Sequence, residues 1–251
     1  MGPFSAPRDF LPDLTEELLE ANRNWMEPTD LDPETGKLIL CIQSYLVRTP
    51  HHTVLIDTCV GNDKDRAFDA WNHMQGPFLD DLKKAGFPRE SIDTVLCTHL
   101  HIDHVGWNTM WVDGKWVPTF PNAKYVMSRT DHDHWSALAQ KSDTEVYQVN
   151  TYNDSVLPIV EAGKAVMIES DHQPDPLLTI RDYPGHTPGS IAINLKDAGK
   201  HLDPKTRDLI SVITKVHAQT ERGDLVAGDV DARRAVLALG LDTVIRQGVD
   251  D

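Results

Sequence analysis

Three histidines and one aspartate lie within six consecutive positions of the sequence, in the pattern His-x-His-x-Asp-His from His99 to His104. Imidazole nitrogens bind zinc and similar divalent cations, and carboxylates and water complete an open, catalytic coordination shell. A buried cluster of such polar groups is unfavourable by itself, and a bound cation removes the penalty. The pattern therefore predicts a metal site, and metal-assisted hydrolysis is the chemistry that an open site of this kind supports.

The segments around this pattern are expected to place its side chains at the end of a strand. The apolar, β-branched run 91–98 directly before the pattern predicts a buried strand. Residues two apart on a strand share a face, so His99 and His101 can point the same way where the strand opens into a loop. A second loop, 183–190, lies between two predicted strands and carries His186.

Strands and helices alternate along the chain in two similar halves, which predicts a layered α/β architecture. A tight turn at Asp113-Gly114 predicts a hairpin. An N-terminal helix with an apolar stripe is expected to be capped by Asp13 and Glu16. Strands are further expected at 38–47, 53–57, 123–128, 165–170, 177–183 and 191–196, and helices at 76–87, at 129–140 and within 152–162.

Three pieces of the sequence together resemble the metallo-β-lactamase-fold hydrolases. They are "VLIDTCVGND" at 54–63, "THLHIDHVGW" at 98–107 and "YPGHTPGS" at 183–190. Within that superfamily the chain looks most like the branch of N-acyl-homoserine lactonases and methyl-parathion-hydrolase-like enzymes. The resemblance implies one α/β domain, an αββα sandwich, with an incomplete or divergent C-terminal part. Its segments are an N-terminal helix and lead-in at 1–37, the family match at 38–196 and a divergent tail at 197–251.

The resemblance also implies roles for individual residues. It makes His99, His101 and His186 the ligands of a first metal, and Asp103 and His104 ligands of a second metal. Asp103 is in addition the expected catalytic residue, which orients the nucleophile or passes a proton to the leaving group. For Asp57, at the end of a predicted strand, two interpretations stay open: it orients a histidine of the site, or it caps the loop that follows.

Two further ligands that the family pattern implies, a bridging aspartate and a late histidine, have no clear counterpart. Asp229 follows a strand-like segment, and Asp208 lies at a more usual separation from His186, so both are candidates for the aspartate. His201 and His217 are the histidines that remain. The tail after 196 contains no Phe, Trp or Tyr. It is either a divergent ending with one good metal site, or a segment outside the family's reading frame.

The resemblance implies a hydrolase in which a metal-bound hydroxide attacks a lactone or ester, with N-acyl-homoserine-lactone-type substrates favoured and phosphotriester hydrolysis as a side activity. The expected cofactor is one or two Zn²⁺ ions, with iron or manganese as alternatives for a shell of histidines and aspartates. The competing interpretation is an inactive or mononuclear metal-binding relative that has lost the second site. A redox partner protein fits poorly, since no flavin-binding segment is visible.

The net charge of −15 argues against nucleic-acid binding and favours a neutral or apolar small-molecule substrate. The sequence has neither a run of roughly 20 apolar residues nor a basic-then-apolar leader, so we expect a cytoplasmic protein that does not span a membrane. Cys41, Cys59 and Cys97 form no CxxC pair and predict neither disulfides nor a thiolate zinc site. The N-terminal helix could mediate a homodimer or pack on its own domain.

The remaining histidines and the tryptophans close to the metal pattern have more ordinary explanations. His132 and His134 are two apart on a predicted helix and point to different faces, so they are not expected to bind one metal. The same expectation holds for His51, His52, His73 and His172. For the tryptophans, an apolar pocket near the metals and simple core packing both stay open. These are Trp107, Trp111 and Trp116.

Overall fold

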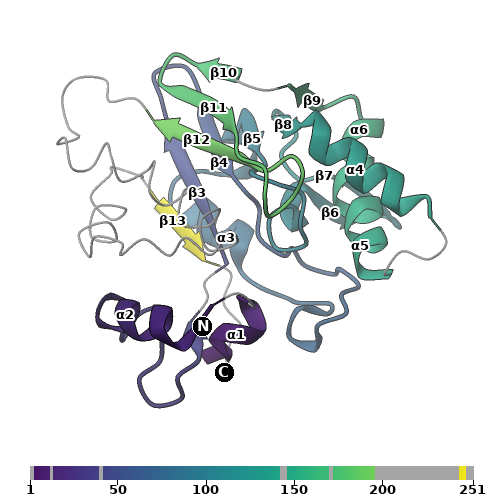
Figure 1. Cartoon of the computed structure of the whole chain (residues 1–251). Coiled ribbons are helices and arrows are strands. Elements are labelled where there is room, and N and C mark those ends of the chain that lie inside the picture. Colours follow the sequence, from purple (N-terminus) through teal and green to yellow (C-terminus); the bar gives the residue numbers. More distant parts are fainter. Residues whose placement is uncertain are drawn as a thin grey trace.

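The computed structural model describes residues 3–11, 14–39, 42–141, 146–169, 172–195 and 243–246. Its largest sheet is mixed and has six strands, in the order β13-β3-β4-β5-β8-β9 (Figure 1). The expected hairpin is present, because β3 and β4 pair antiparallel, whereas β4, β5, β8 and β9 run parallel to one another. The strands are β3 (Gln43–Arg48), β4 (Thr53–Ile56), β5 (Thr94–Leu96), β8 (Lys124–Ser128), β9 (Ala165–Ile168) and β13 (Thr243–Arg246).

A second, antiparallel sheet of three strands packs on one face of the large sheet. It consists of β10 (His172–Asp175), β11 (Leu178–Asp182) and β12 (Ile191–Leu195). Val54 and Ile56 of β4 and Val126 of β8 form one hydrophobic core with Ile180 and Ile193 of this smaller sheet. Side chains two apart on a strand share a face, so the alternating residues of the same strands point to the opposite side.

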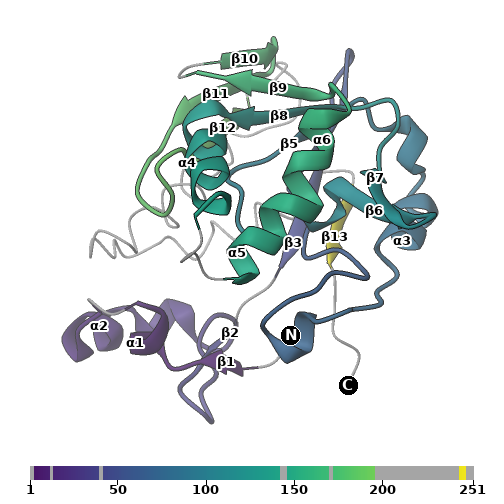
Figure 2. The same ribbon diagram turned by 90° about the vertical axis from the view of Figure 1, so that its right-hand side faces the viewer.

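Helices cover that opposite side of the large sheet (Figure 2). Leu55 of β4 and Tyr125 of β8 lie in a second core with Phe78, Trp135 and Ile159. These last three residues belong to α3 (Phe78–Lys84), α4 (Arg129–Ala139) and α6 (Leu157–Glu161). The described residues thus contain two sheet layers and one helical layer of the predicted αββα sandwich.

A small N-terminal unit lies beside these layers (Figures 1 and 2). It contains β1 (Pro3–Ser5), α1 (Pro7–Phe10), α2 (Glu16–Met26) and β2 (Leu38–Ile39). The expected helix is α2, but its cap is Thr15, whose Oγ1 accepts a hydrogen bond of 3.3 Å from the Leu18 backbone N–H. Asp13, the predicted cap, lies outside the described residues. Within the described part of the chain, no helix is both long and apolar enough to cross a membrane.

The predicted hairpin at Asp113-Gly114 is confirmed. It joins β6 (Thr109–Val112) to β7 (Lys115–Pro118), and the two turn residues have φ angles of 49° and 81°. Positive φ at both positions is the requirement of a two-residue turn whose twist matches the strands. Short 3₁₀ turns lie at Asp69–Trp71, Arg89–Ser91 and Gly106–Asn108.

The helix expected within 152–162 begins earlier and is not uniform. It comprises α5 (Val146–Thr151), a π-helical turn (Tyr152–Val156) and α6. Pro158 has no backbone N–H, so the Asp154 carbonyl four residues before it has no ordinary helical donor. Lys64 Nζ, at 3.1 Å, and Thr109 Oγ1 donate to that carbonyl instead. A tertiary contact that the local pattern does not encode therefore accompanies the irregular turn.

Besides β1, two strands were not expected from the sequence. Strand β10 has the sequence His-Gln-Pro-Asp, which lacks the apolar alternation of a strand, and it lies at an edge where proline is tolerated. Strand β13 lies in the tail, pairs with β3 and forms the edge of the large sheet. The strand-like segment before Asp229 lies outside the described residues.

Candidate metal centre

Three predicted ligands converge from two loops. His99 and His101 follow β5, and His186 comes from the loop that joins β11 to β12. One ligand nitrogen from each ring lies within 4.8 Å of the others. The ring centroids are 4.9 Å apart for His99 and His101, 4.6 Å for His99 and His186, and 4.4 Å for His101 and His186. We call these residues the three-histidine cluster.

The donor chemistry of this cluster fits a divalent metal of the zinc type. Nitrogen ligands lie about 2.1 Å from zinc, so the nitrogens of a tetrahedral site are roughly 3.4 Å apart. Nδ1 of His101 and Nε2 of His186 are 2.8 Å apart, which is shorter than that spacing, and the three ligand nitrogens all lie within 4.8 Å of one another. The two loops are joined directly, since the Ile191 backbone N–H donates to the Thr98 carbonyl at 2.9 Å. Three neutral imidazoles leave a metal its full charge, which is what hydrolytic chemistry requires.

His104 and Asp103 lie next to the cluster, in contact with each other. The His104 ring centroid is 3.9 Å from that of His99, and its Nε2 is 3.4 Å from Oδ2 of Asp103. Burial alone would lower the pKa of His104, but the carboxylates of Asp103 and Asp57 outweigh it and hold this pKa well above its ordinary value. Burial likewise would raise the pKa of Asp103, and the His104 charge holds it well below its usual range. Their role as ligands of a second metal stays a prediction.

Asp57 performs both of the functions considered for it. It ends β4 with a positive φ of 55°, and its carboxylate accepts hydrogen bonds from the backbone N–H and the Oγ1 of Thr98, both at 2.8 Å. Its Oδ2 also lies 2.8 Å from Nδ1 of His104. One buried carboxylate therefore closes the loop after β5 and orients a histidine of that loop.

The loops after β4 and β5 run in close backbone contact. The Gly106 N–H donates to the Cys59 carbonyl at 2.7 Å, and the Thr58 N–H donates to the His104 carbonyl at 2.7 Å. A Cβ at Gly106 would lie 1.8 Å from the carbonyl oxygen of Val60. Only glycine fits where the two loops cross, and this crossing holds His104 beside Asp57.

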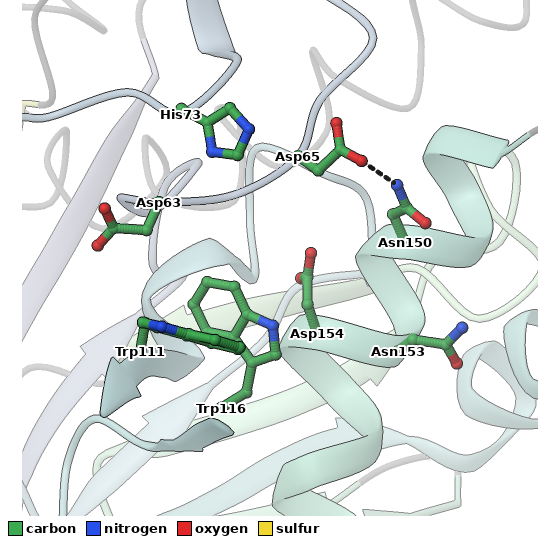
Figure 3. Close-up of a pocket in the computed structure, with 8 residues that line it drawn as sticks. All are labelled: Asp63, Asp65, His73, Trp111, Trp116, Asn150, Asn153 and Asp154. Atoms are coloured by element: carbon green, nitrogen blue, oxygen red, sulfur yellow. Dashed lines mark hydrogen bonds between the residues drawn. The ribbon is translucent and has the colours of Figure 1, made fainter. Parts of the chain in front are cut away.

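Of the three tryptophans, one packs in the core and two line a pocket away from the three-histidine cluster. Trp107 is core, stacked on Phe78 with ring centroids 5.7 Å apart. Trp111 and Trp116, on the β6–β7 hairpin, line a pocket of about 570 Å³ (Figure 3). The other residues that line it are Asp63, Asp65, His73, Asn150, Asn153 and Asp154. None of them belongs to the three-histidine cluster, so these two tryptophans do not line a pocket at the metal centre, and the residues that share their pocket are polar.

A buried charge network lies beneath this pocket. Arg66 donates two hydrogen bonds to the Asp154 carboxylate, at 2.6 and 3.0 Å, and Lys64 Nζ lies 3.5 Å from the same group. Lys64 also lies over the Trp116 ring, 3.5 Å from its centroid. Burial lowers the pKa of Lys64 to about 7, and the nearby Asp154 opposes that shift only in part. The network fixes the hairpin and the π-helical turn against the loop after β4.

Two of the other histidines contact side chains outside the three-histidine cluster. Nδ1 of His52 lies 3.2 Å from Asp93, and Nε2 of His132 lies 3.2 Å from the Tyr152 hydroxyl. In the described ranges, the three-histidine cluster is the group of His, Cys, Asp and Glu side chains whose geometry could hold a metal ion. The candidates in the tail lie outside the described residues, namely Asp208, Asp229, His201 and His217.

Sequence reasoning missed one buried carboxylate at the centre. Asp131, in the first turn of α4, accepts hydrogen bonds from the backbone N–H groups of Leu100 and Gly189, which belong to the two loops that carry the cluster. The spacing of Ser128 and Asp131 is typical of a helix N-terminus, and Ser128 Oγ does accept from the Asp131 N–H at 3.5 Å. That local signal predicts a cap but not the contacts to distant loops.

Comparison with known families identifies the chain. The model of the metallo-β-lactamase superfamily matches residues 42–202, which is more than half of its length. The chain belongs to the metallo-β-lactamase superfamily. The αββα architecture expected from the resemblance is the fold of this superfamily, and the two packed sheets with helices on the outer face agree with it.

The relatives that match this chain include N-acyl homoserine lactonases. The lactonase of Bacillus thuringiensis is 23% identical over 182 residues, which cover 66% of this chain and 64% of the lactonase. The lactonase of Bacillus cereus is 24% identical over 182 residues, with 65% of this chain and 63% of the lactonase covered. The chain thus spans less than two thirds of the length of these superfamily relatives.

Solved structures of the superfamily share the fold. A probable metal-dependent hydrolase from Staphylococcus aureus has a TM-score of 0.59 at 18% identity, over 78% of this chain and 66% of the other. AidC, described as a dizinc quorum-quenching lactonase in complex with a product, has a TM-score of 0.57 at 22% identity, over 92% and 75%. At these identities the similarity establishes the architecture alone.

Proposed function

We propose that this metallo-β-lactamase superfamily member is a metal-dependent hydrolase of lactones or esters, with N-acyl homoserine lactones as the favoured substrates. The observation that carries the proposal is the convergence of His99, His101 and His186 from two loops. The names of the lactonase relatives support the substrate class. Phosphotriester hydrolysis is proposed as a side activity, because the same arrangement of groups serves attack at phosphorus.

In this proposal the three-histidine cluster holds the metal, with zinc as the favoured ion. A bound divalent metal supplies Lewis acidity, which activates water at neutral pH and polarises the substrate carbonyl. Asp103, whose side chain is 30% exposed beside the cluster, is proposed to orient the nucleophile or to hold a second ion. Asp57 keeps His104 in one orientation by accepting from its Nδ1.

A metal assay joined to a substrate panel tests this function. The full chain is purified, its metal content per chain is measured by mass spectrometry, and turnover is measured on N-acyl homoserine lactones, an aryl ester and a phosphotriester. His101→Ala should lose both metal and turnover, whereas the matched control His52→Ala, in the β3–β4 turn, should keep both. Undiminished metal content and turnover in His101→Ala would contradict the proposal.

The alternative function is a mononuclear or inactive metal-binding relative. One observation favours it: His104 contacts both Asp103 and Asp57, and neither His104 nor Asp103 is part of the group that could hold one ion. About one zinc per chain with no turnover on any member of the panel would support this alternative. Two metals per chain with lactone turnover would exclude it.

The remaining partner proposals follow from charge and from the N-terminal unit. The net charge of −15 supports a neutral or apolar small substrate and disfavours nucleic acid. A cytoplasmic location, and a homodimer formed through α2, stay predictions. Cell fractionation tests the first and the molar mass in solution tests the second.

A further inference from the structure

We propose that Asp131 is a positioning residue that fixes the distance between the two loops of the three-histidine cluster. The side chain is fully buried at the start of α4, between these loops. Oδ2 accepts from the Leu100 backbone N–H at 2.8 Å, and Oδ1 accepts from the Gly189 backbone N–H at 3.1 Å. The inference rests on the metal-binding part of the proposed function.

Each contact of Asp131 lies next to a member of the cluster. Leu100 lies between His99 and His101 in the sequence, so the bond to its N–H fixes the backbone that carries both rings. Gly189 lies three positions after His186, within the same short loop. One carboxylate thereby sets where the first pair of imidazoles lies relative to the third.

The close approach of Gly189 to α4 supports this role independently. A Cβ at Gly189 would lie 2.3 Å from the Asp131 backbone nitrogen and 2.6 Å from Ser128 Oγ. The loop of His186 is therefore seated directly on the first turn of α4, where only glycine leaves enough space. Within that loop, the Ser190 hydroxyl accepts from the Thr187 N–H at 3.1 Å and keeps the turn closed.

A third contact connects Asp131 to a ring of the cluster. Nε1 of Trp135, one helical turn later in α4, donates to Oδ2 of Asp131 at 3.3 Å. The Trp135 ring packs edge-to-face on His101, with centroids 5.2 Å apart at 62°. Asp131 thus holds the backbone beside His101 directly and the packing surface of its ring through Trp135.

The contacts require a carboxylate in particular. Asp131 accepts from three N–H groups of other residues through its two oxygens, and the N-terminal end of α4 favours negative charge. An asparagine of the same size keeps one acceptor oxygen and turns an N–H₂ group toward a backbone N–H. One of the two loops then loses its bond and leaves a buried donor unsatisfied.

The test compares metal affinity with stability in Asp131→Asn and in a matched variant, Asp175→Asn. Asp175 is also buried and accepts from a backbone N–H and a hydroxyl, Leu177 at 2.8 Å and Thr49 at 2.7 Å, but it lies at the edge strand β10. The probe is Co²⁺, whose affinity for each full-length variant is measured by competition with a chromophoric chelator. Asp131→Asn should bind Co²⁺ about 10- to 100-fold more weakly, as is typical when a group that orients ligands is changed.

Asp175→Asn should unfold more easily and keep wild-type Co²⁺ affinity. Equal Co²⁺ affinity of Asp131→Asn and the wild type, with stability reduced as in Asp175→Asn, would overturn the positioning role.

If Asp131→Asn does not fold, a second variant, Trp135→Phe, removes one hydrogen bond to Asp131 and retains an aromatic ring against His101. A several-fold loss of Co²⁺ affinity in Trp135→Phe supports the role, and unchanged affinity overturns it.

The two proposals fail in different ways. If the wild type binds Co²⁺ but hydrolyses no member of the panel, the proposed hydrolase function is contradicted. The Co²⁺ affinities of the wild type and Asp131→Asn then still decide the positioning role of Asp131. An active wild type whose Asp131→Asn variant binds Co²⁺ equally well contradicts the positioning role alone. A wild type that binds no divalent metal overturns both.

Discussion

Oδ2 of Asp57 lies 2.8 Å from Nδ1 of His104, across 47 positions of the sequence. The same carboxylate accepts hydrogen bonds from the backbone N–H and the hydroxyl of Thr98, which directly precedes the His-x-His-x-Asp-His pattern. The end of β4 therefore holds the loop after β5 at both of its ends, and the orientation of His104 depends on a residue far from it in the chain.

This relationship predicts the effect of Asp57→Asn. An amide cannot accept from all three donors, so we expect the metal affinity of the chain to fall about 10- to 100-fold. The free energy of unfolding should fall by about 1–3 kcal/mol, because a buried donor loses its acceptor. Chelator competition and urea unfolding measure the two effects.

Asp93→Asn is the matched control for Asp57→Asn. Asp93 also accepts from a backbone N–H, that of Thr53 at 2.8 Å, and lies 3.2 Å from Nδ1 of a histidine, His52. Asp93 lies before β5, at the opposite end of that strand from His99 and His101, so its variant should keep metal affinity. The orienting role of Asp57 fails if both variants lose metal affinity to the same degree.

Gly106→Ala should be severely destabilising. The added Cβ would lie 1.8 Å from the Val60 carbonyl oxygen, with backbone on both sides, so the two loops must separate. We expect a loss of at least about 3 kcal/mol in the free energy of unfolding, at the upper end for single substitutions. Gly163→Ala provides the contrast, since its φ is 65° but nothing lies within 4 Å, and it should cost only about 1 kcal/mol. Thermal unfolding of the two variants checks this difference, and similar losses would disprove the steric argument.

The stability of the protein should depend on pH through Lys64. Burial lowers its pKa to about 7 in the folded chain, whereas in the unfolded chain the pKa is near 10.5. At pH values between these two pKa values, Lys64 carries a proton in the unfolded chain but not in the folded chain. The free energy of unfolding therefore rises as pH increases from about 7 to 10.5, by a few kcal/mol, and this contribution is lost as pH falls toward 7.

Lys64→Met should remove that part of the pH dependence. Urea unfolding of the wild type and of Lys64→Met at several pH values between 7 and 10 gives the difference directly, because other titrating groups cancel. Parallel curves for the two proteins would show that Lys64 keeps an ordinary pKa in its contact with Asp154.

Metal binding should be visible in the unfolding temperature. A ligand that binds only the folded chain stabilises it, by about 2.7 kcal/mol at a free concentration of 100 times its Kd. Adding Zn²⁺ to chelator-treated protein should therefore raise the melting temperature, and His101→Ala should abolish the increase. His132→Ala, whose ring contacts Tyr152, serves as the control and should retain it. An equal increase in all three proteins would place the stabilising ion elsewhere.

The sequence by itself determined the features that depend on neighbouring residues. The His-x-His-x-Asp-His pattern indicated the chemistry, the apolar run before it predicted a buried strand, and Asp113-Gly114 predicted a hairpin. Each of these features depends on residues close together in the chain. On a strand, residues two apart share a face, and in a two-residue turn both residues must adopt positive φ.

Only the tertiary structure decided which distant groups meet. It placed Asp131 between the loops of His101 and His186, joined Asp57 to His104 and assigned Trp111 and Trp116 to a pocket away from the three-histidine cluster. The irregular turn before Pro158 likewise depends on Lys64 and Thr109, which no local pattern connects to it. Such contacts arise from the packing of whole layers against each other, and a local sequence pattern carries no information about which loops that packing brings together.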